Sequence, residues 1–401
     1  MMPVSSPPPG RLGATSSADR ADEVVGSRRN DLIALSHDIH AEPELAFAEH
    51  RSCAKTQALV AERGFTMTRA PGGLETAFRA EFGSGDLVVG ICAEYDALPD
   101  IGHACGHNII AASAVGAALA LAEVADDLGL KVVLIGTPAE ENGGGKVLLL
   151  TANVFDDIDV AVMIHPGPVD IAATRSLAMS DVAVNYRGHE SHASIAPHLG
   201  LNAGDAATVA QVAIGLLRQH LEPGQQVHGI VTDGGRAANV IPGSASMRYG
   251  MRAFDQESLQ SVQRRVFDCF RAGALATGCE CDIDQSAPAY DALRSDPWLA
   301  SVFREELTRC GRDPVSEELE TGLRLGSTDM GNVTQVLPGI HPIIGVEAGG
   351  ASLHQPEFTA AAVTPSADKA VIDGSVMLAR TVIRLAETPS ERERVHERRM
   401  S

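Results

Sequence analysis

The chain has few basic side chains for its length. Among 401 residues, 32 Lys and Arg stand against 52 Asp and Glu, which gives a formal net charge of −20. Nucleic acids and anionic membrane surfaces are bound through basic patches, so we expect neither as a partner. No run approaches the roughly 20 consecutive apolar residues of a membrane-spanning helix. Aromatic residues make up only 4%, so composition does not indicate how a binding pocket would be lined.

Signals for export are also missing. Residues 1–20 are rich in Pro, Ser, Gly and Ala and lack the apolar centre of a signal peptide, so we expect a disordered arm there. The seven cysteines are odd in number and scattered, which does not indicate a disulfide framework. Cys279 and Cys281 alternate along a strand-like stretch without a second Cys or His pair nearby, which is a poor signal for zinc. We therefore expect a reducing, cytoplasmic location.

Two common catalytic motifs are absent. No Gly-x-Ser-x-Gly occurs, which excludes the serine nucleophile turn of α/β-hydrolases. The stretch from Gly143 to Lys146 resembles a phosphate-binding loop, but that motif requires glycine where Glu140 stands and Ser or Thr after Lys146. Neither a serine hydrolase nor a P-loop enzyme is predicted.

Side chains suited to metal binding are present as an ordered set. Thiolate, imidazole and carboxylate groups together favour Zn²⁺ or a similar divalent ion. Directly before one proposed ligand stands a second carboxylate, Glu140, which is free to act as a base. A metal ion beside a base activates water, so the set predicts a metal-dependent hydrolase. The proposed ligands are Cys105, His107, Glu141, His165 and His354.

The hydrophobic pattern predicts strands that alternate with helices. Apolar runs at 87–93, 131–136 and 159–164 are typical of buried strands, and an Ala-rich helix is expected over His107–Val124. This alternation indicates a largely parallel α/β sheet. Most of the proposed ligands follow the ends of these strands, where open α/β sheets form their sites. Pattern and chemistry therefore agree on one site.

A smaller domain is expected inside the larger one. Residues 177–290 follow a β-α-β-β-α-β order, which is the ferredoxin-like motif. The sequence then returns to α/β character and supplies His354, so the metal-binding domain is discontinuous. We expect that domain over 21–176 and 291–388, followed by a charged C-terminal tail at 389–401.

Several motifs occur in the order found in one enzyme family. Over roughly residues 31–386 the chain resembles peptidase family M20, the aminoacylase and carboxypeptidase type of metallopeptidases and amidohydrolases. It is similar to the N-acyl amino acid amidohydrolase branch. Cys-Gly-His-Asn, with Ser-Thr-Asp-Met-Gly-Asn at 327–332, resembles a narrower subgroup of p-aminobenzoyl-glutamate hydrolase subunits and related dipeptidases, and actinobacterial amidohydrolases look closest. The matching motifs are His-Ala-Glu-Pro-Glu-Leu (40–45), Asp-Ala-Leu-Pro (96–99), His-Ala-Cys-Gly-His (103–107), Pro-Ala-Glu-Glu (138–141), His-Ala (192–193), Asn-Val-Ile-Pro (239–242) and Leu-His-Gln (353–355).

The resemblance implies roles for the site residues. The proposed ligands would hold one or two Zn²⁺ or Mn²⁺ ions per subunit. The inserted domain would serve as lid and dimerisation domain, so a homodimer is expected, and within it His192, Asn239 and Arg252 match substrate-binding positions. The sequence departs from the family where many members place a metal-binding His. This chain has Glu94 there, as expected if Cys105 supplies part of the ligand set.

The residues themselves support this chemistry. A bound divalent ion lowers the pKa of water to about 7 and polarises a carbonyl group. Glu140, which matches the family's general base, would take a proton from this water and deliver it to the leaving amine. Asp96 would orient His107 through a hydrogen bond, and His192 would stabilise the developing oxyanion. The planar guanidinium of Arg252 suits a substrate carboxylate.

The predicted function is hydrolysis of amide bonds in N-acyl amino acids or related small amides with a free carboxylate. A dipeptidase or carboxypeptidase of the same family is an alternative. An alternative of another class is a metal-stabilised binding protein without catalysis, which the presence of Glu140 beside the full ligand set disfavours. A turnover assay with added Mn²⁺ or Zn²⁺ would separate these classes.

Overall fold

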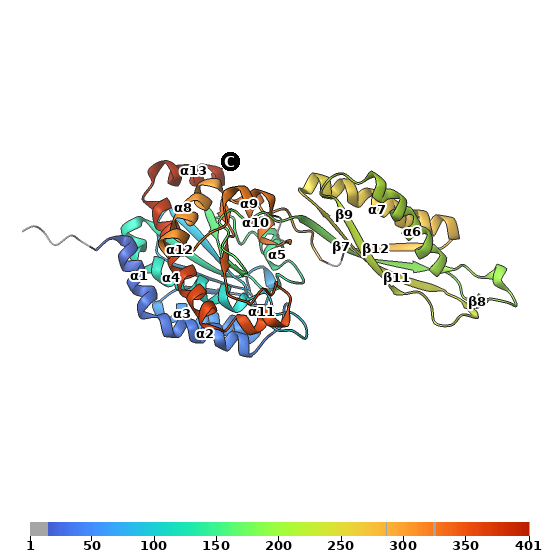
Figure 1. Ribbon diagram of the computed structural model, residues 1–401, viewed down its shortest axis with the longest axis horizontal. Helices are drawn as coiled ribbons and strands as arrows, with labels where there is room; N and C mark the ends of the chain where they lie inside the picture. Colours follow the sequence, from blue (N-terminus) through green and yellow to red (C-terminus); the bar gives the residue numbers. More distant parts are fainter. Residues whose placement is uncertain (1–14, 286, 324–325, 401) are drawn as a thin grey trace, which may run out of the picture.

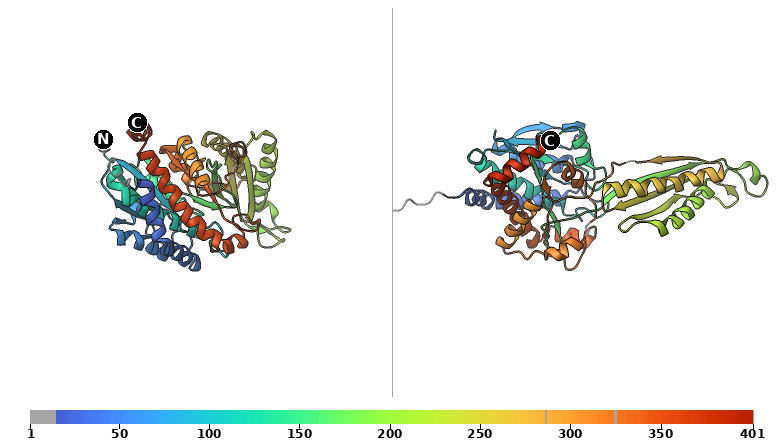
Figure 2. Two further views of the ribbon diagram at one scale, coloured as in Figure 1. Left: turned by 60° about the vertical axis from the view of Figure 1, so that its left-hand side comes forward. Right: turned by 90° about the horizontal axis from the view of Figure 1, so that it is seen from above.

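Two domains of unequal size make up an elongated molecule (Figure 1). The computed structural model describes residues 15–285, 287–323 and 326–400. The smaller domain projects away from the larger one, as a second direction of view also shows (Figure 2). The two chain crossings between the domains lie side by side, because Met179 and Tyr290 exchange two backbone hydrogen bonds of 2.8 and 2.9 Å.

The larger domain is organised around a mixed six-stranded sheet. Every side chain of the central strand β3 (Leu87–Ala93) is buried, as its apolar run predicts. Strand β3 pairs in parallel with β4 and β5, and β13 continues the parallel part, whereas β1 and β2 are antiparallel additions at one edge. The predicted, mainly parallel sheet is confirmed. Its other strands are β1 (Thr66–Arg69), β2 (Phe78–Phe82), β4 (Leu130–Gly136), β5 (Val160–Val162) and β13 (Gly339–Ile340), and β6 (His165–Gly167) pairs separately with β14 (Ile343–Gly345).

Helices cover both faces of this sheet, because alternate side chains of β3 belong to two different hydrophobic clusters. The Ala-rich helix α4 (His107–Leu128) packs closely on α12 (Pro365–Ala386). Helix α4 is long and apolar enough to span a membrane, but 94% of its most apolar stretch is buried inside this domain. The remaining helices are α1 (Ser17–Ser27), α2 (Arg29–Ala41), α3 (His50–Arg63), α5 (Gly145–Thr151), α8 (Pro297–Arg309), α9 (Glu317–Gly322), α10 (Met330–Val336), α11 (Pro356–Ala361) and α13 (Pro389–Met400).

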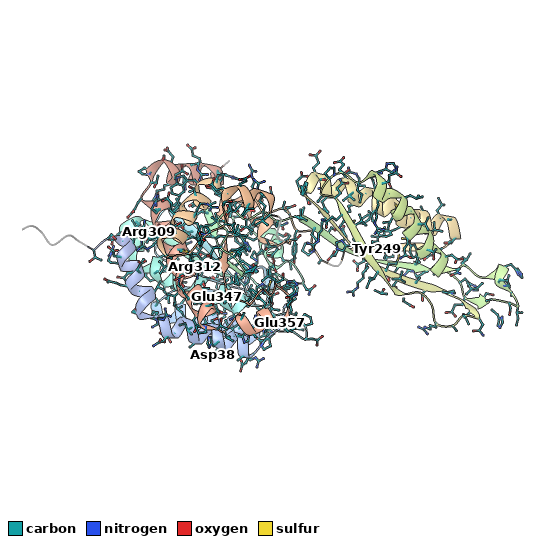
Figure 3. The ribbon with its side chains drawn as sticks, in the orientation of Figure 1. Asp38, Tyr249, Arg309, Arg312, Glu347 and Glu357 are labelled. Carbon is teal, nitrogen blue, oxygen red and sulfur yellow. The ribbon has the colours of Figure 1, made fainter. Side chains whose placement is uncertain are left out.

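The smaller domain is an antiparallel sheet with strand order β12-β7-β11-β9, and two helices pack on it. Its core contains Tyr249, whose ring lies 5.3 Å from that of Phe270 between centroids (Figure 3). The predicted ferredoxin-like insertion is confirmed. In chain order its elements are β7 (Ala178–Arg187), β8 (Ser191–His192), α6 (Ala203–Leu217), β9 (Gln226–Asp233), β10 (Val240–Ile241), β11 (Ser244–Ala253), α7 (Gln256–Thr277) and β12 (Glu280–Asp284).

The disordered arm expected over residues 1–20 needs correction at its end. Helix α1 begins at Ser17, and the side chain of Ser16 accepts a hydrogen bond from the backbone N–H of Asp19. Such a cap starts a helix even where the composition favours disorder. Residues 1–14 of the expected arm lie outside the described residues.

The charged C-terminal tail expected at 389–401 is a docked helix, α13, up to position 400. Val395 is fully buried, and Arg394 donates a hydrogen bond of 2.8 Å to Asp296. Arg392 on the same helix also donates hydrogen bonds to the carbonyls of Leu128 (2.7 Å) and Gly129 (2.9 Å). A composition dominated by charge does not reveal them.

Candidate metal centre

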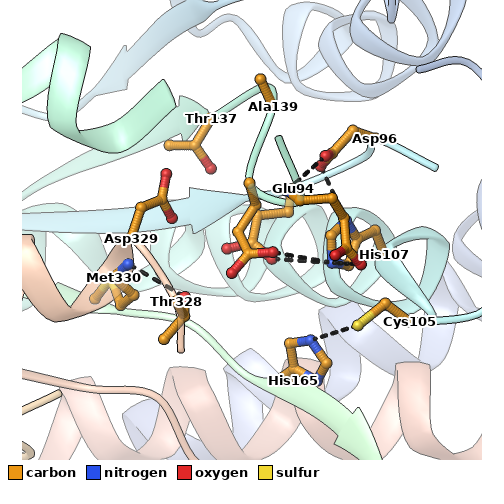
Figure 4. A network of polar contacts seen from close by, with 12 residues as sticks. Glu94, Asp96, Cys105, His107, Thr137, Ala139, His165, Thr328, Asp329 and Met330 are labelled. Carbon is orange, nitrogen blue, oxygen red and sulfur yellow. Dashed lines mark hydrogen bonds and ion pairs between the residues drawn. The ribbon is translucent and has the colours of Figure 1, made fainter. Parts of the chain in front are cut away.

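The proposed metal ligands come from separate segments of the chain that meet at one edge of the central sheet. Figure 4 shows three of them, Cys105, His107 and His165. Glu141 follows β4, and His165 begins β6 shortly after β5. Cys105 lies between β3 and α4, His107 is the first residue of α4, and His354 precedes α11. Because parallel strands end at the same edge of a sheet, the loops after them converge. The structure brings all five side chains together.

The distances between these side chains match those of ligands around a shared ion. The Sγ of Cys105 lies 3.5 Å from Nε2 of His165 and 3.5 Å from Nε2 of His354. The Nε2 of His354 lies 3.4 Å from Oε1 of Glu141. Tetrahedral zinc, with bonds of about 2.3 Å to sulfur and about 2.0–2.1 Å to nitrogen, separates its ligands by about 3.5 Å. The donor set therefore fits a divalent ion.

Cys105 belongs to two groups of ligand atoms, and within each group the atoms lie within 4.8 Å of one another. One group consists of Cys105, His107 and His165, and the other of Cys105, Glu141 and His354. Burial raises the pKa of the Cys105 thiol well above its ordinary value. A sulfur shared by two three-residue groups fits one ion or a pair of ions.

His107 is held by one carboxylate and faces three more. Its Nδ1 lies 2.9 Å from Oδ1 of Asp96 in a fully buried contact, the one expected for Asp96, which leaves Nε2 free. That Nε2 lies 3.5 Å from Oε2 of Glu94 and 3.9 Å from an oxygen of Glu140 and of Glu141. Burial lowers the pKa of His107, but Asp96 and the other carboxylates raise it well above its ordinary value. An imidazole nitrogen among carboxylate oxygens calls for a proton or a metal ion between them.

The carboxylate proposed as base projects from a strained turn. Ala139 has a φ of 59°, in the left-handed region that residues other than glycine rarely adopt. Glu140 is 6% exposed, and burial, together with neighbouring carboxylates, raises its pKa well above the ordinary value. Three side chains hold backbone groups of this turn. The N–H of Ala139 donates to Oε1 of Glu49 (2.9 Å), the N–H of Glu141 donates to Oδ2 of Asp96 (3.0 Å), and the Oη of Tyr290 donates to the carbonyl of Glu140 (2.7 Å).

A fully buried trio of charges lies beside the metal-binding groups. The Nζ of Lys146 donates hydrogen bonds to Oε1 of Glu94 and, at 2.6 Å, to Oδ1 of Asp329. Burial is the largest single influence and raises the pKa of Glu94, but the ammonium of Lys146 and the neighbouring imidazoles, His107 first among them, together lower the pKa to about 2. No local pattern predicts this trio, because Glu94 and Asp329 lie 52 and 183 positions from Lys146.

A cavity of about 540 Å³ opens beside the ligand cluster and is walled by both domains. The larger domain contributes Glu140, and the smaller one contributes Met179, Asp181 and Arg252. The Nη1 of Arg252 donates a hydrogen bond of 3.1 Å to the Oγ of Ser327 in the larger domain. Small-molecule sites span roughly 300–1,000 Å³. The cavity therefore suits a small substrate with one end at Arg252.

Two further polar side chains line this cavity. His341, which follows β13, and Thr174 are 4% and 3% exposed. Within the described part of the chain, neither ring nitrogen of His341 nor the Oγ1 of Thr174 has a hydrogen-bond partner. Burial lowers the pKa of His341 to about 3, so its ring is neutral. Sequence reasoning missed both residues, because neither belongs to a motif with catalytic or metal-ligand spacing.

His192 and Asn239 do not line this cavity, so their predicted contact with substrate stays a prediction. His192 lies in β8 and Asn239 directly precedes β10, and these paired strands lie at the far end of the smaller domain (Figure 1). The exposed ring of His192 accepts a hydrogen bond of 3.3 Å from the N–H of Ser194, and the carbonyl of Asn239 accepts one of 3.0 Å from Ala193. The long strands β7 and β11 carry this end away from the ligand cluster. Of the three residues expected from this domain, only Arg252 lines the cavity.

Fold and site together define the class of metal-dependent α/β hydrolases whose inserted domain forms one wall of the cavity. Comparison with protein families supports this class, since residues 90–380 match the model for peptidase family M20/M25/M40. The chain belongs to this family and is a hydrolase of amide or peptide bonds.

Relatives by sequence cover most of the chain. The Xaa-Arg dipeptidase of Mus musculus is 39% identical over 95% of this chain and 93% of its own, and that of Homo sapiens is 36% identical over 94% and 91%. A p-aminobenzoyl-glutamate hydrolase subunit of Escherichia coli (strain K12) is 31% identical over 78% and 70%. The expected similarity to both kinds of protein is confirmed.

Solved structures show the same fold. An aminobenzoyl-glutamate utilization protein from Klebsiella pneumoniae superposes with a TM-score of 0.71 at 20% identity, over 91% of this chain and 98% of its own. A Bacillus subtilis protein, described as a dinuclear metal-binding peptidase of the M20 family, superposes with a TM-score of 0.68 at 23% identity, over 90% and 99%. The predicted fold class is therefore confirmed over nearly the whole chain.

Proposed function

We propose that the enzyme hydrolyses dipeptides whose C-terminal residue has a cationic side chain. The observation that carries this proposal is the placement of Asp181 and Arg252 in one cavity wall. Strand register pairs Arg252 with Met179 and Gly250 with Asp181, so the four residues lie on one face of the sheet. Gly250 has no side chain to separate the guanidinium from the carboxylate. A terminal carboxylate next to a cationic group complements this pair, and the Xaa-Arg dipeptidases among the relatives support the choice.

The five clustered side chains would hold one or two divalent ions, Zn²⁺ or Mn²⁺. A bound ion supplies Lewis acidity and a water of lowered pKa. Sharing of Cys105 between two ligand groups supports a pair of ions. Thiolate and imidazole donors favour zinc, whereas the carboxylate also suits manganese.

The remaining chemistry belongs to the protein's own groups. Glu140 accepts a proton from the attacking water and delivers it to the leaving amine, and its raised pKa suits a group that carries a proton between two partners. Asp96 fixes the ring of His107. Arg252 binds the terminal carboxylate of the substrate through a charge-assisted hydrogen bond.

The inserted domain would act as lid and as contact between two copies of the chain. His192 and Asn239 would then reach a substrate only after the smaller domain changes its position or from another subunit. The edge strand β9 supports a contact surface, because Ile230 and Val231 on it are 62% and 41% exposed, and Leu216 on α6 is 70% exposed. Edge strands with exposed apolar side chains pair readily with other chains.

A substrate screen tests the proposed reaction. Enzyme that has been chelated and reloaded with Zn²⁺ or Mn²⁺ is given Ala-Arg, Ala-Lys, Ala-Ala, N-acetyl-arginine and p-aminobenzoyl-glutamate. A hydrogen bond to a charged group is worth about 1.5–3 kcal/mol, so kcat/KM for Ala-Arg and Ala-Lys should exceed that for Ala-Ala by at least about tenfold. The variant Asp181→Asn should remove this preference and leave Ala-Ala cleavage unchanged.

Each other result of the screen has a defined meaning. Faster cleavage of N-acetyl-arginine or p-aminobenzoyl-glutamate would replace the proposal with an N-acyl amino acid amidohydrolase. Turnover that persists after verified metal removal would defeat metal dependence. Absence of any turnover with metal bound would favour the non-catalytic binding protein.

A further inference from the structure

The second chain crossing between the domains contributes a side chain to the candidate active site. Tyr290 lies on this crossing, and its backbone pairs with Met179 on the first crossing. Its side chain is 4% exposed and forms part of the cavity wall. The hydroxyl of Tyr290 donates a hydrogen bond of 2.7 Å to the backbone carbonyl of Glu140. One residue therefore touches both the domain junction and the peptide that carries the proposed base.

The backbone of Tyr290 is itself anchored to the larger domain. Asn332 in α10 donates a hydrogen bond of 3.2 Å to the carbonyl of Ala289 and accepts one of 3.0 Å from the N–H of Asp291. These bonds hold the residues on both sides of Tyr290. The ring of Tyr290 also packs against the three successive glycines at 143–145, since a Cβ added to Gly144 would lie 2.9 Å from the ring.

The turn that carries Glu140 requires such support. The left-handed backbone at Ala139 is strained and persists only where surrounding contacts fix it. Glu49 and Asp96 hold the N–H groups on either side of Glu140, and Tyr290 alone among the three donates to its carbonyl. Loss of this bond leaves the peptide between Glu140 and Glu141 held only at its N–H, by Asp96. The base can then shift, and catalysis is sensitive to shifts of about 1 Å.

We propose that Tyr290 is a positioning residue that couples the seating of the inserted domain to the direction of the Glu140 carboxylate. The proposal rests on the assignment of Glu140 as the base. Asn332 acts in the same chain of contacts, because it holds the backbone from which the Tyr290 side chain extends.

The first experiment compares Tyr290→Phe with Tyr186→Phe. Both variants remove one buried hydroxyl that donates to a backbone carbonyl, since the Oη of Tyr186 donates a 2.9 Å bond to Phe270 inside the smaller domain. With Ala-Arg, or the fastest substrate of the screen above, Tyr290→Phe should lower kcat about tenfold. Its KM and metal content should stay within twofold of the wild-type values. Tyr186→Phe should lower Tm by a similar amount and leave kcat unchanged.

The second experiment is a double-mutant cycle with Asn332→Ala. If Asn332 acts through Tyr290, it lowers kcat in the wild-type protein and has little further effect in Tyr290→Phe. Equal kcat losses in Tyr290→Phe and Tyr186→Phe, a wild-type kcat in Tyr290→Phe, or independent effects in the cycle would each overturn the inference. Glu140→Gln separates the base assignment from the proposed role of Tyr290. Full activity of Glu140→Gln would refute the base assignment. An inactive Glu140→Gln together with a fully active Tyr290→Phe would refute only the coupling.

Discussion

Glu140 and Glu141 are neighbours in the chain, yet their surroundings shift their pKa values in opposite directions. Burial raises the pKa of Glu140. Burial also acts to raise the pKa of Glu141, but its hydrogen bond to His354 and the charge of His107 lower the value below the ordinary one. The environment of Glu140 suits a group that exchanges a proton, and that of Glu141 suits a ligand that stays charged. Two successive positions in one turn thereby acquire different roles.

The first residue-scale prediction concerns the base. Glu140→Gln keeps the size of the side chain and removes its ability to accept a proton, so kcat should fall by about 10²–10⁴-fold. Elemental analysis should find the same metal content as in the wild type, because Glu140 is proposed as the base and not as a ligand. Glu140 forms a third group of close donor atoms with Glu94 and His107, so a loss of metal in this variant would make Glu140 a ligand instead. Near-wild-type turnover in the metal-replete variant would remove Glu140 from the mechanism.

A second residue-scale prediction concerns the buried ammonium group of Lys146. Lys146→Met leaves two buried carboxylates without their cation, and breaking a buried pair in this way costs about 3–5 kcal/mol. The matched change Lys131→Met removes an ammonium from a partly exposed pair with Glu81 and Asp157, which is worth about 0–1 kcal/mol. Denaturant unfolding of both variants measures the difference. Similar losses of unfolding free energy in the two variants would mean that burial does not make the trio more important to stability than an exposed ion pair.

At the scale of elements, the sequence predicts the strands and helices whose hydrophobic pattern results from burial in the core. Strands β3 and β4 are apolar runs, and the Ala-rich helix expected over His107–Val124 is α4, which extends to Leu128. Strands β1 and β2 were not predicted, because Thr-Met-Thr-Arg and Phe-Arg-Ala-Glu-Phe are short and mix charged with apolar residues. They form because β4 offers its free edge to β2, which then pairs with β1.

The candidate site shows the same limit. The proposed metal ligands belong to motifs with recognisable chemistry, so the sequence predicts that they lie together, and the structure brings them together. Tyr290, His341 and Thr174 reach the site through distant packing, which leaves no local signal. For His192 and Asn239 the motifs contain no information about the position of a whole domain, so their contact with substrate stays a prediction.

A prediction at this scale concerns the contact between α4 and α12. A Cβ added to Gly116 would lie 2.1 Å from the Oγ of Ser375, so Gly116→Ala should destabilise the protein by about 1–3 kcal/mol through overpacking. Gly215 in α6 has no atom within 4 Å of such a Cβ, so Gly215→Ala should stabilise by up to about 1 kcal/mol. Thermal unfolding of both variants should therefore show shifts of opposite sign. Shifts of the same sign would contradict the packing argument.

At the scale of the whole molecule, the cavity belongs to neither domain alone. The ligand cluster and Glu140 come from the larger domain, and Arg252 comes from the smaller one. The bond between Arg252 and Ser327 crosses the junction near the two paired crossings. In the proposed function, substrate recognition and catalysis are therefore divided between two domains whose relative position matters.

This division predicts how substrates are recognised. Arg252→Ala should reduce kcat/KM about ten- to a hundredfold for amides with a free carboxylate, because a charge-assisted hydrogen bond of about 1.5–3 kcal/mol is lost. The same substrates with a neutral carboxamide should lose much less. Parallel assays of Ala-Arg and Ala-Arg-amide measure the contrast. Equal losses on both would show that Arg252 acts only through its contact with Ser327.

A second prediction at this scale concerns assembly. If two copies meet through β9 and α6, light scattering should give twice the chain mass, and Ile230→Lys with Leu216→Glu should give monomers. Charges at exposed apolar positions of an edge strand oppose pairing. Leu275 on α7 is 88% exposed but lies on another helix, so Leu275→Lys is a suitable control and should leave the mass unchanged. A monomeric wild type would end the proposal of a homodimer.

The paired crossings at Met179 and Tyr290 also determine the order in which the chain can fold during synthesis. The smaller domain is continuous in sequence, so it can fold as soon as it leaves the ribosome, as domains generally fold as units. The larger domain must wait, because α12 packs on α4 and β13 completes the sheet. His354 is the last of the five ligands to be made. The metal centre therefore assembles late in synthesis, around an inserted domain that already has its own core.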